Sequence, residues 1–190
     1  MIEWLIVPIA YLIGSISSAI IICRLMGLPD PREQGSGNPG ATNVMRIGGK
    51  KAAAITLFGD LLKGFIPVYI ANLLGGSALL LASTGLAAFL GHLYPLFFKF
   101  KGGKGVATSI GVLLGFSWLL GLAFTATWLL IYKIGKISSA SALIASVLSP
   151  IFAWLITGDI TIVGVSIIMM LFLLWRHQSN IKRLLAGEEN

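Results

Sequence analysis

The sequence predicts an all-α protein, a polytopic membrane bundle of seven transmembrane helices. It forms one domain over residues 1–190, with the amino terminus outside and the carboxyl terminus cytoplasmic. Composition is the first observation: 56% of the residues are hydrophobic and 11% are charged, whereas soluble domains carry about 25% charged residues. Second, long apolar runs alternate with short polar segments. Third, thirteen of the fourteen lysines and arginines fall in four polar segments, at residues 24–51, 99–104, 133–136 and 176–183.

The apolar runs are long enough for membrane helices. A hydrocarbon core of roughly 30 Å needs about 20 helical residues to cross. The runs lack the alternating pattern of a membrane barrel, so helices satisfy their backbone polar groups. The runs cover residues 4–23, 52–74, 78–98, 105–132, 137–157 and 160–175.

The first run is expected to stay in the protein as a membrane helix. It begins after Glu3 and is followed by Arg24, the reverse of the charge order in a removable signal peptide. Cys23, the single cysteine, is expected to be a buried apolar side chain, without a disulfide or a metal site.

Residues 105–132 decide the number of crossings, because as one helix they would be roughly 42 Å long. Two short helices with an outside amino terminus place thirteen cations in the cytoplasm and none outside. One long helix leaves eight inside and five outside, against the positive-inside rule. We therefore expect two helices, with a turn among Gly115, Ser117 and Gly121 and with Trp118 at the interface.

The first polar cluster lies at residues 35–46. Its glycines expose successive backbone N–H groups, which can wrap phosphate oxygens together with hydroxyl and amide side chains. The G-x-G-x-x-G match at Gly35, Gly37 and Gly40 is weak evidence for a dinucleotide site, because such a site needs a preceding strand and the residues before it are Pro29–Gln34. A flexible connecting loop is the alternative. The candidate phosphate-binding residues are Gly35, Ser36, Gly37, Asn38, Thr42, Asn43 and Arg46.

The second cluster, at residues 99–108, combines lysines with glycines just before an apolar run. The amino-terminal N–H groups of a helix there would point at the same space as the lysines. The alternative is a basic loop on anionic lipid headgroups, which would need no glycines. The candidates are Lys101, Gly102, Gly103, Lys104, Gly105 and Thr108.

The third cluster contains Arg176, His177, Asn180 and Arg183. If the last helix continues through it, Arg176, Asn180 and Arg183 share one face. A basic amphipathic tail at the membrane surface is the alternative, and it explains His177 and Asn180 less well.

Three further polar residues fall inside the apolar runs. Asp60 and Lys63 are one helical turn apart, and a structural ion pair is at least as good an interpretation as a catalytic one. For His92 we favour a ring that is hydrogen-bonded between helices.

Together the clusters resemble a known family. The sequence resembles the bacterial acyl-phosphate:glycerol-3-phosphate acyltransferases in three motifs. They are GSGNPGATN at residues 35–43, Gly91-His92 followed by FKFKGGKGVAT at 98–108, and the Arg-His…Asn-Ile…Arg-Leu…Gly-Glu pattern at 176–188. The resemblance covers nearly the whole chain. It implies transfer of a fatty acyl group from acyl phosphate to the 1-hydroxyl of glycerol 3-phosphate, at the start of phospholipid synthesis.

The resemblance also implies a multi-pass protein of the bacterial cytoplasmic membrane whose site faces the cytoplasm. Glycerol 3-phosphate and acyl phosphate are the expected substrates and membrane lipids the surroundings. We expect no cofactor, no metal, no nucleic acid and no obligatory protein partner.

The residues suit a direct attack by the acceptor hydroxyl. The His-x-x-x-x-Asp spacing of soluble-type glycerolipid acyltransferases is absent at both His92 and His177. Acyl phosphate is already activated, so the main tasks are to hold two anions and to stabilise charge on the carbonyl. The expected catalytic residues are Ser36, Lys104, His177 and Asn180. A transporter or channel for a phosphorylated metabolite is the alternative function.

Overall fold

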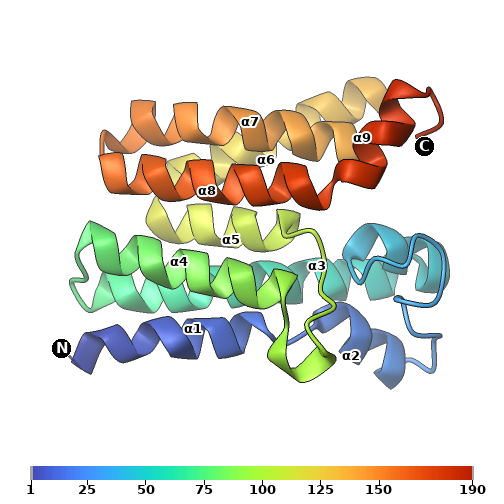
Figure 1. Ribbon diagram of the computed structural model, residues 1–190, viewed down its shortest axis with the longest axis horizontal. Coiled ribbons are helices and arrows are strands. Elements are labelled where there is room, and N and C mark those ends of the chain that lie inside the picture. Colours follow the sequence, from blue (N-terminus) through green and yellow to red (C-terminus); the bar gives the residue numbers. More distant parts are fainter. Residues whose placement is uncertain (1, 190) are drawn as a thin grey trace.

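The computed structural model describes residues 2–189, in which helices and connecting loops account for every segment. The long helices lie side by side along the longest axis of the molecule (Figure 1). The elements are η1 (Ile2–Leu5), α1 (Ile6–Gly14), α2 (Ser18–Leu25), α3 (Ala41–Leu73), α4 (Ala78–Leu93), η2 (Leu96–Phe98), α5 (Val106–Phe116), α6 (Trp118–Gly135), α7 (Ser138–Thr157), α8 (Ile160–Arg176) and α9 (Gln178–Leu185).

The expected division of residues 105–132 is present. α5 ends at Phe116 and α6 begins at Trp118, with the extended residue Ser117 between them. Trp118 is 65% exposed, as expected for an aromatic side chain at a membrane interface.

The count of seven crossings stays a prediction. Four described helical segments are long and apolar enough to cross a membrane: α3, residues 78–98, α6 and α7. The number rises to six if α1 with α2 and α8 with α9 each form one bent span. α5 has only 11 residues, which makes it roughly 16 Å long and shorter than a hydrocarbon core of roughly 30 Å.

Two expected continuous helices are bent. The first apolar run divides into α1 and α2, which meet at an angle of 42°, and Cys23 is buried in α2. The expectation of a last helix that continues through the third cluster is wrong. α8 ends at Arg176, and α9 leaves it at 62°, because His177 (φ −97°, ψ 11°) departs from helical geometry.

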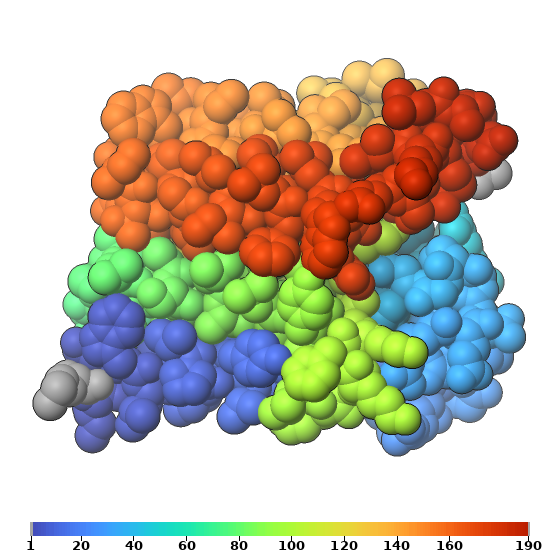
Figure 2. Space-filling view, viewed as in Figure 1, coloured from blue at the N-terminus to red at the C-terminus, as the bar shows by residue number. Residues whose placement is uncertain are grey.

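The helices form two neighbouring groups (Figure 1). α1 packs on α4, and α3 packs on α4 and α5, whereas α7 packs between α6 and α8. A shared hydrophobic core joins the groups through residues such as Phe89, Leu113, Phe124 and Met169. On the surface, the yellow-green segment between α4 and α5 lies between α1 and the lighter blue segment after α2 (Figure 2).

Small residues allow the closest helix crossings. A Cβ on Gly111 of α5 would lie 2.0 Å from the carbonyl oxygen of Leu61 in α3. A Cβ on Gly14 of α1 would lie 2.1 Å from the carbonyl oxygen of Ala88 in α4. Backbones approach this closely in membrane bundles where glycine replaces a larger residue.

Candidate functional site

A cavity of about 450 Å³ lies between the two helix groups. Its walls come from α3, α5, α6 and α7, and the segment beyond α8 closes it. All three polar clusters reach it. The sequence-predicted site residues that line it are Gly35, Ser36, Asn38, Thr42, Asn43, Arg46, Lys104, Gly105, His177, Asn180 and Arg183.

Six other predicted residues are outside this lining: Gly37, Lys101, Gly102, Gly103, Thr108 and Arg176. Arg176 and Thr108 instead make hydrogen bonds to the backbone of segments that line the cavity or adjoin it. The Arg176 guanidinium donates to the carbonyl oxygens of Gly102 at 2.8 Å and Gly103 at 3.2 Å. The Thr108 hydroxyl donates to the carbonyl oxygen of Asp60 at 3.0 Å. Lys101 is exposed.

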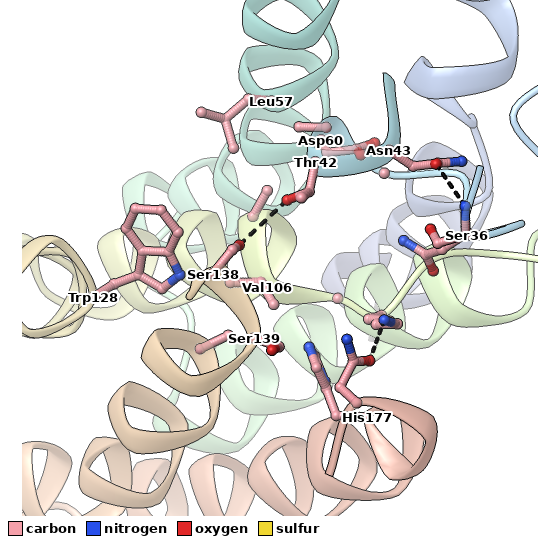
Figure 3. A pocket seen from close by; sticks show the side chains of 18 of the residues that line it. Ser36, Thr42, Asn43, Leu57, Asp60, Val106, Trp128, Ser138, Ser139 and His177 are labelled. Carbon is pink, nitrogen blue, oxygen red and sulfur yellow. Dashed lines mark hydrogen bonds between the residues drawn. The ribbon is translucent and has the colours of Figure 1, made fainter. Parts of the chain in front are cut away.

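Asn43 gives the first cluster its shape. Its Oδ1 accepts from the backbone N–H of Ser36 at 2.9 Å, and its Nδ2 donates to the carbonyl oxygens of Pro31 and Gln34. Gly35 has φ +60°, and a Cβ there would lie 2.2 Å from Asn43 Oδ1. The buried amide therefore holds a tight glycine loop against the first turn of α3, with the Ser36 side chain in the cavity lining (Figure 3).

A chain of polar contacts joins the second and third clusters across the cavity. Lys104 Nζ donates to Asn180 Oδ1, and Asn180 Nδ2 donates to Glu189 Oε1. The Ser139 hydroxyl also donates to Glu189 Oε1 at 2.7 Å, and Arg183 Nε donates to Oε2. Residues of the loop before α5, of α7 and of the carboxyl-terminal segment thus meet in one network.

The charge of Lys104 depends on its surroundings. Burial, together with repulsion from Arg183, Arg176 and Arg46, lowers the pKa of Lys104 to about 8, although Glu189 favours its charged form. The ammonium is still mostly protonated at neutral pH. It is a partly desolvated cation, which attracts an anion more strongly than an exposed lysine does.

His177 has the properties of a neutral acceptor. It lies just beyond α8, and burial lowers its pKa to about 4. Its Nδ1 is 2.8 Å from the carbonyl oxygen of Leu173. A carbonyl only accepts, so the neutral ring carries its proton on Nδ1 and leaves the Nε2 lone pair free. The ring lines the cavity (Figure 3).

The cavity also has an apolar side. Leu57 of α3, Ile110 of α5 and Trp128 of α6 line it, together with Val106, Leu129 and Ala142. The Trp128 ring stacks on Tyr132 with a centroid separation of 5.0 Å. At the rim, the hydroxyls of Thr42 and Ser138 are 3.3 Å apart and link α3 to α7 (Figure 3). One cavity therefore offers both anion-binding groups and hydrophobic surface.

The intramembrane polar residues form one buried cluster in the cavity wall. Lys63 Nζ lies 2.8 Å from Asp60 Oδ1, so the expected ion pair is present. His92 Nδ1 lies 3.7 Å from the same oxygen. The hydrogen-bonded ring that we expected for His92 is not found at Nδ1, which has no hydrogen-bond partner among the described residues.

Sequence reasoning missed several lining residues: Asp60 and His92 as cavity walls, and Trp128, Ser138, Ser139 and Glu189 altogether. Glu189 had a usable signal, because it is a carboxylate shortly after three cations. Burial of Glu189 and the hydrogen bonds from its neighbours have opposite effects on its pKa. Burial disfavours ionisation, but hydrogen bonds from Ser139, Asn180 and Arg183 lower the pKa of Glu189 overall. No group of three potential metal ligands occurs within residues 2–189.

Comparison with known proteins gives a consistent result. The profile of a family described as glycerol-3-phosphate acyltransferase matches residues 4–187. A glycerol-3-phosphate acyltransferase of Methylococcus capsulatus is 55% identical over 99% of this chain and 95% of its own length. Another from Hydrogenovibrio crunogenus is 59% identical over 95% of this chain and 87% of its own.

Two solved structures have the same fold. Both are crystal structures of PlsY, an integral membrane glycerol 3-phosphate acyltransferase. The glycerol 3-phosphate form has a TM-score of 0.95 and 40% identity, and the lysophosphatidic acid form has 0.93 and 39%. Each match covers 100% of this chain and 95% of the other.

Proposed function

This chain belongs to the glycerol-3-phosphate acyltransferase family, and on that premise we propose that it transfers a fatty acyl group from acyl phosphate to the 1-hydroxyl of glycerol 3-phosphate. The products are lysophosphatidic acid and inorganic phosphate. One observation carries the proposal: a single cavity joins cationic and amide groups from three clusters to an apolar wall. Both substrates are anions, and the donor also has a hydrocarbon tail.

The polar side of the cavity suits two phosphates. Lys104, Arg46 and Arg183 supply positive charge, and the glycine loop at 35–40 supplies backbone N–H groups and the Ser36 hydroxyl. Two phosphates repel each other, and partly buried cations offset that repulsion because the local dielectric is low. Ser36, Lys104 and Asn180 orient the phosphates in this proposal.

The apolar side suits the part of the acyl chain next to the carbonyl. Leu57, Ile110 and Trp128 present hydrocarbon there, and Leu57 is about half exposed on the outer surface of α3. A lipid donor can therefore leave most of its tail in the bilayer while its phosphate enters the polar side.

The reaction needs no acyl-enzyme. The 1-hydroxyl oxygen attacks the carbonyl carbon of acyl phosphate, an ester C–O bond forms, and the bond from carbon to the phosphate oxygen breaks. The hydroxyl proton goes to the departing phosphate, so the step balances with neither metal nor cofactor. His177 can assist the movement of this proton through Nε2. Its Nδ1 is engaged with the Leu173 carbonyl oxygen, so the Nε2 lone pair is free to accept a proton.

Purified protein supplied with acyl phosphate and glycerol 3-phosphate tests the function. We expect lysophosphatidic acid and phosphate in equal amounts, and no product when acyl-CoA or acyl carrier protein replaces acyl phosphate. Acyl phosphate alone should leave the intact mass of the protein unchanged, and an increase by one acyl group would overturn direct attack. Movement of labelled glycerol 3-phosphate into liposomes without acylation would favour a transporter instead.

The proposed setting is the bacterial cytoplasmic membrane, with seven crossings, an outside amino terminus and the site facing the cytoplasm. The positive-inside rule supports this orientation. In a background without Cys23, single cysteines at the exposed positions Ser36, Lys101 and Lys182 should react with a membrane-impermeant reagent only from the cytoplasmic side.

A further inference from the structure

The buried cluster of Asp60, Lys63 and His92 has no part in the chemistry just described, although two of its members reach the cavity. Asp60 on α3 is 3% exposed, His92 on α4 is 5% exposed, and both line the cavity. Lys63 balances the carboxylate and also donates to the carbonyl oxygen of Ile16 at 2.8 Å. Buried charges at membrane depth are costly, so this cluster requires an explanation.

His92 is in direct contact with the lysine loop, residues 99–105. The backbone N–H of Gly103 donates to the carbonyl oxygen of His92 at 3.3 Å. A Cβ on Gly103 would lie 2.3 Å from His92 Nε2, and one on Gly102 would lie 2.0 Å from the His92 carbonyl oxygen. The two glycines are therefore needed because the loop backbone rests on His92.

The same loop is held from the other side and at its end. The Arg176 guanidinium donates to both Gly102 and Gly103, so the glycine pair is clamped between Arg176 and His92. Just beyond the loop, the Thr108 hydroxyl donates to the carbonyl oxygen of Asp60. Lys104 is the residue between these two attachments, and its ammonium points across the cavity to Asn180.

We propose that His92 and Asp60 are positioning residues, which hold the lysine loop so that the Lys104 ammonium reaches the substrate phosphates. The inference rests on the proposed function. Asp60 lies beside the ring of His92 on the α3 side, with its Oδ1 3.7 Å from His92 Nδ1. His92 supports Gly103, and Gly103 sets the direction in which Lys104 leaves the loop. Their effect on the reaction passes through Lys104, because the hydrogen bonds of the network within residues 2–189 join Lys104 to Asn180 and Asn180 to Glu189 and involve neither side chain.

A double-mutant cycle tests this dependence. His92→Gln should lower kcat/KM about tenfold, within the range found for residues in contact. The cause should be mainly an increase in KM for the phosphate substrates, with a smaller change in kcat. In a Lys104→Met background the same substitution should cost less than about twofold. Equal losses in the two backgrounds would mean a general structural role and overturn the inference, as would normal kinetics of His92→Gln.

Two further measurements keep the test decisive. The increase in melting temperature on adding inorganic phosphate can be measured for the wild-type protein and all three variants of the cycle. It reports phosphate binding even if Lys104→Met has no measurable turnover. If His92→Gln does not fold, Asp60→Asn combined with Lys63→Met acts on the same contact from α3 without leaving a buried charge unpaired, and it must show the same dependence on Lys104.

Thr84→Val is the matched control. Thr84 is a buried polar residue on α4, like His92, but its hydroxyl donates within its own helix to the Leu80 carbonyl oxygen. This variant should keep wild-type KM and kcat, and a loss equal to that of His92→Gln would count against the inference. Absence of acylation by the wild-type protein would instead refute the proposed function, so the two failures are distinguishable.

Discussion

Replacing Lys104 with methionine is the most direct test of the proposed site. The change keeps the length of the side chain but removes its charge and the hydrogen bond to Asn180 Oδ1. In the proposed complex the ammonium would donate to a substrate phosphate, and a hydrogen bond to a charged group contributes about 1.5–3 kcal/mol. Because each 1.36 kcal/mol is a factor of ten in rate, kcat/KM for acyl transfer should fall about 10- to 150-fold.

The assay is initial-rate formation of lysophosphatidic acid, with Lys99→Met as the matched control. Lys99 belongs to the same loop, but it is exposed and outside the cavity lining, so its loss should change kcat/KM less than about twofold. The melting temperature of both variants reports their folding. A folded Lys104→Met protein that retains more than half of the wild-type kcat/KM would refute the assignment of this lysine.

Three other outcomes are expected. The value of kcat/KM should fall as pH rises through about 8, because the pKa of Lys104 lies there and only its protonated form attracts phosphate; a Lys104→Arg protein that shows the same decline would contradict this cause. Gly111→Ala should destabilise the protein by about 1–3 kcal/mol, since the new Cβ would meet the Leu61 carbonyl oxygen at 2.0 Å. Gly164→Ala, with nothing within 4 Å, is its control, and equal thermal melting of the two variants would exclude the crossing as the cause. Lys101→Met should leave kcat/KM within about twofold, because Lys101 is exposed, and a loss as large as that of Lys104→Met would place its charge in the site.

The sequence located the polar clusters because their signal is local. Glycines beside hydroxyls, amides and cations are unusual in a chain this apolar, and they remain visible without any knowledge of tertiary structure. The same reasoning could not separate Lys101 from Lys104, two lysines of one loop. The direction of each side chain depends on how the loop rests on His92 and Arg176. The Arg176 contact joins residues that are 73 positions apart in the chain.

The bends were missed for a different reason. Glycine and proline are the usual signals of an interrupted helix, and neither lies next to the break at His177. Gly14 does end α1, but one glycine within an apolar run is not a sufficient signal for a break. At His177 the ring is held by a contact between its Nδ1 and the Leu173 carbonyl oxygen. Such a contact is not visible in the sequence. The bend matters for the site, because it turns Asn180 and Arg183 towards the loop that carries Lys104.

In the proposed reaction the lipid donor would enter the cavity between α3 and α7. The cavity lies at the junction of the two helix groups, and Val106, Ile110 and Trp128 both line it and pack against the hydrophobic core that joins the groups. Thr42 and Ser138 link α3 to α7 through one hydroxyl pair at an exposed rim. A neutral hydrogen bond in contact with water contributes at most about 1 kcal/mol. Separating α3 from α7 at this rim therefore costs little compared with separating α3 from α5, where Gly111 brings the two backbones into contact.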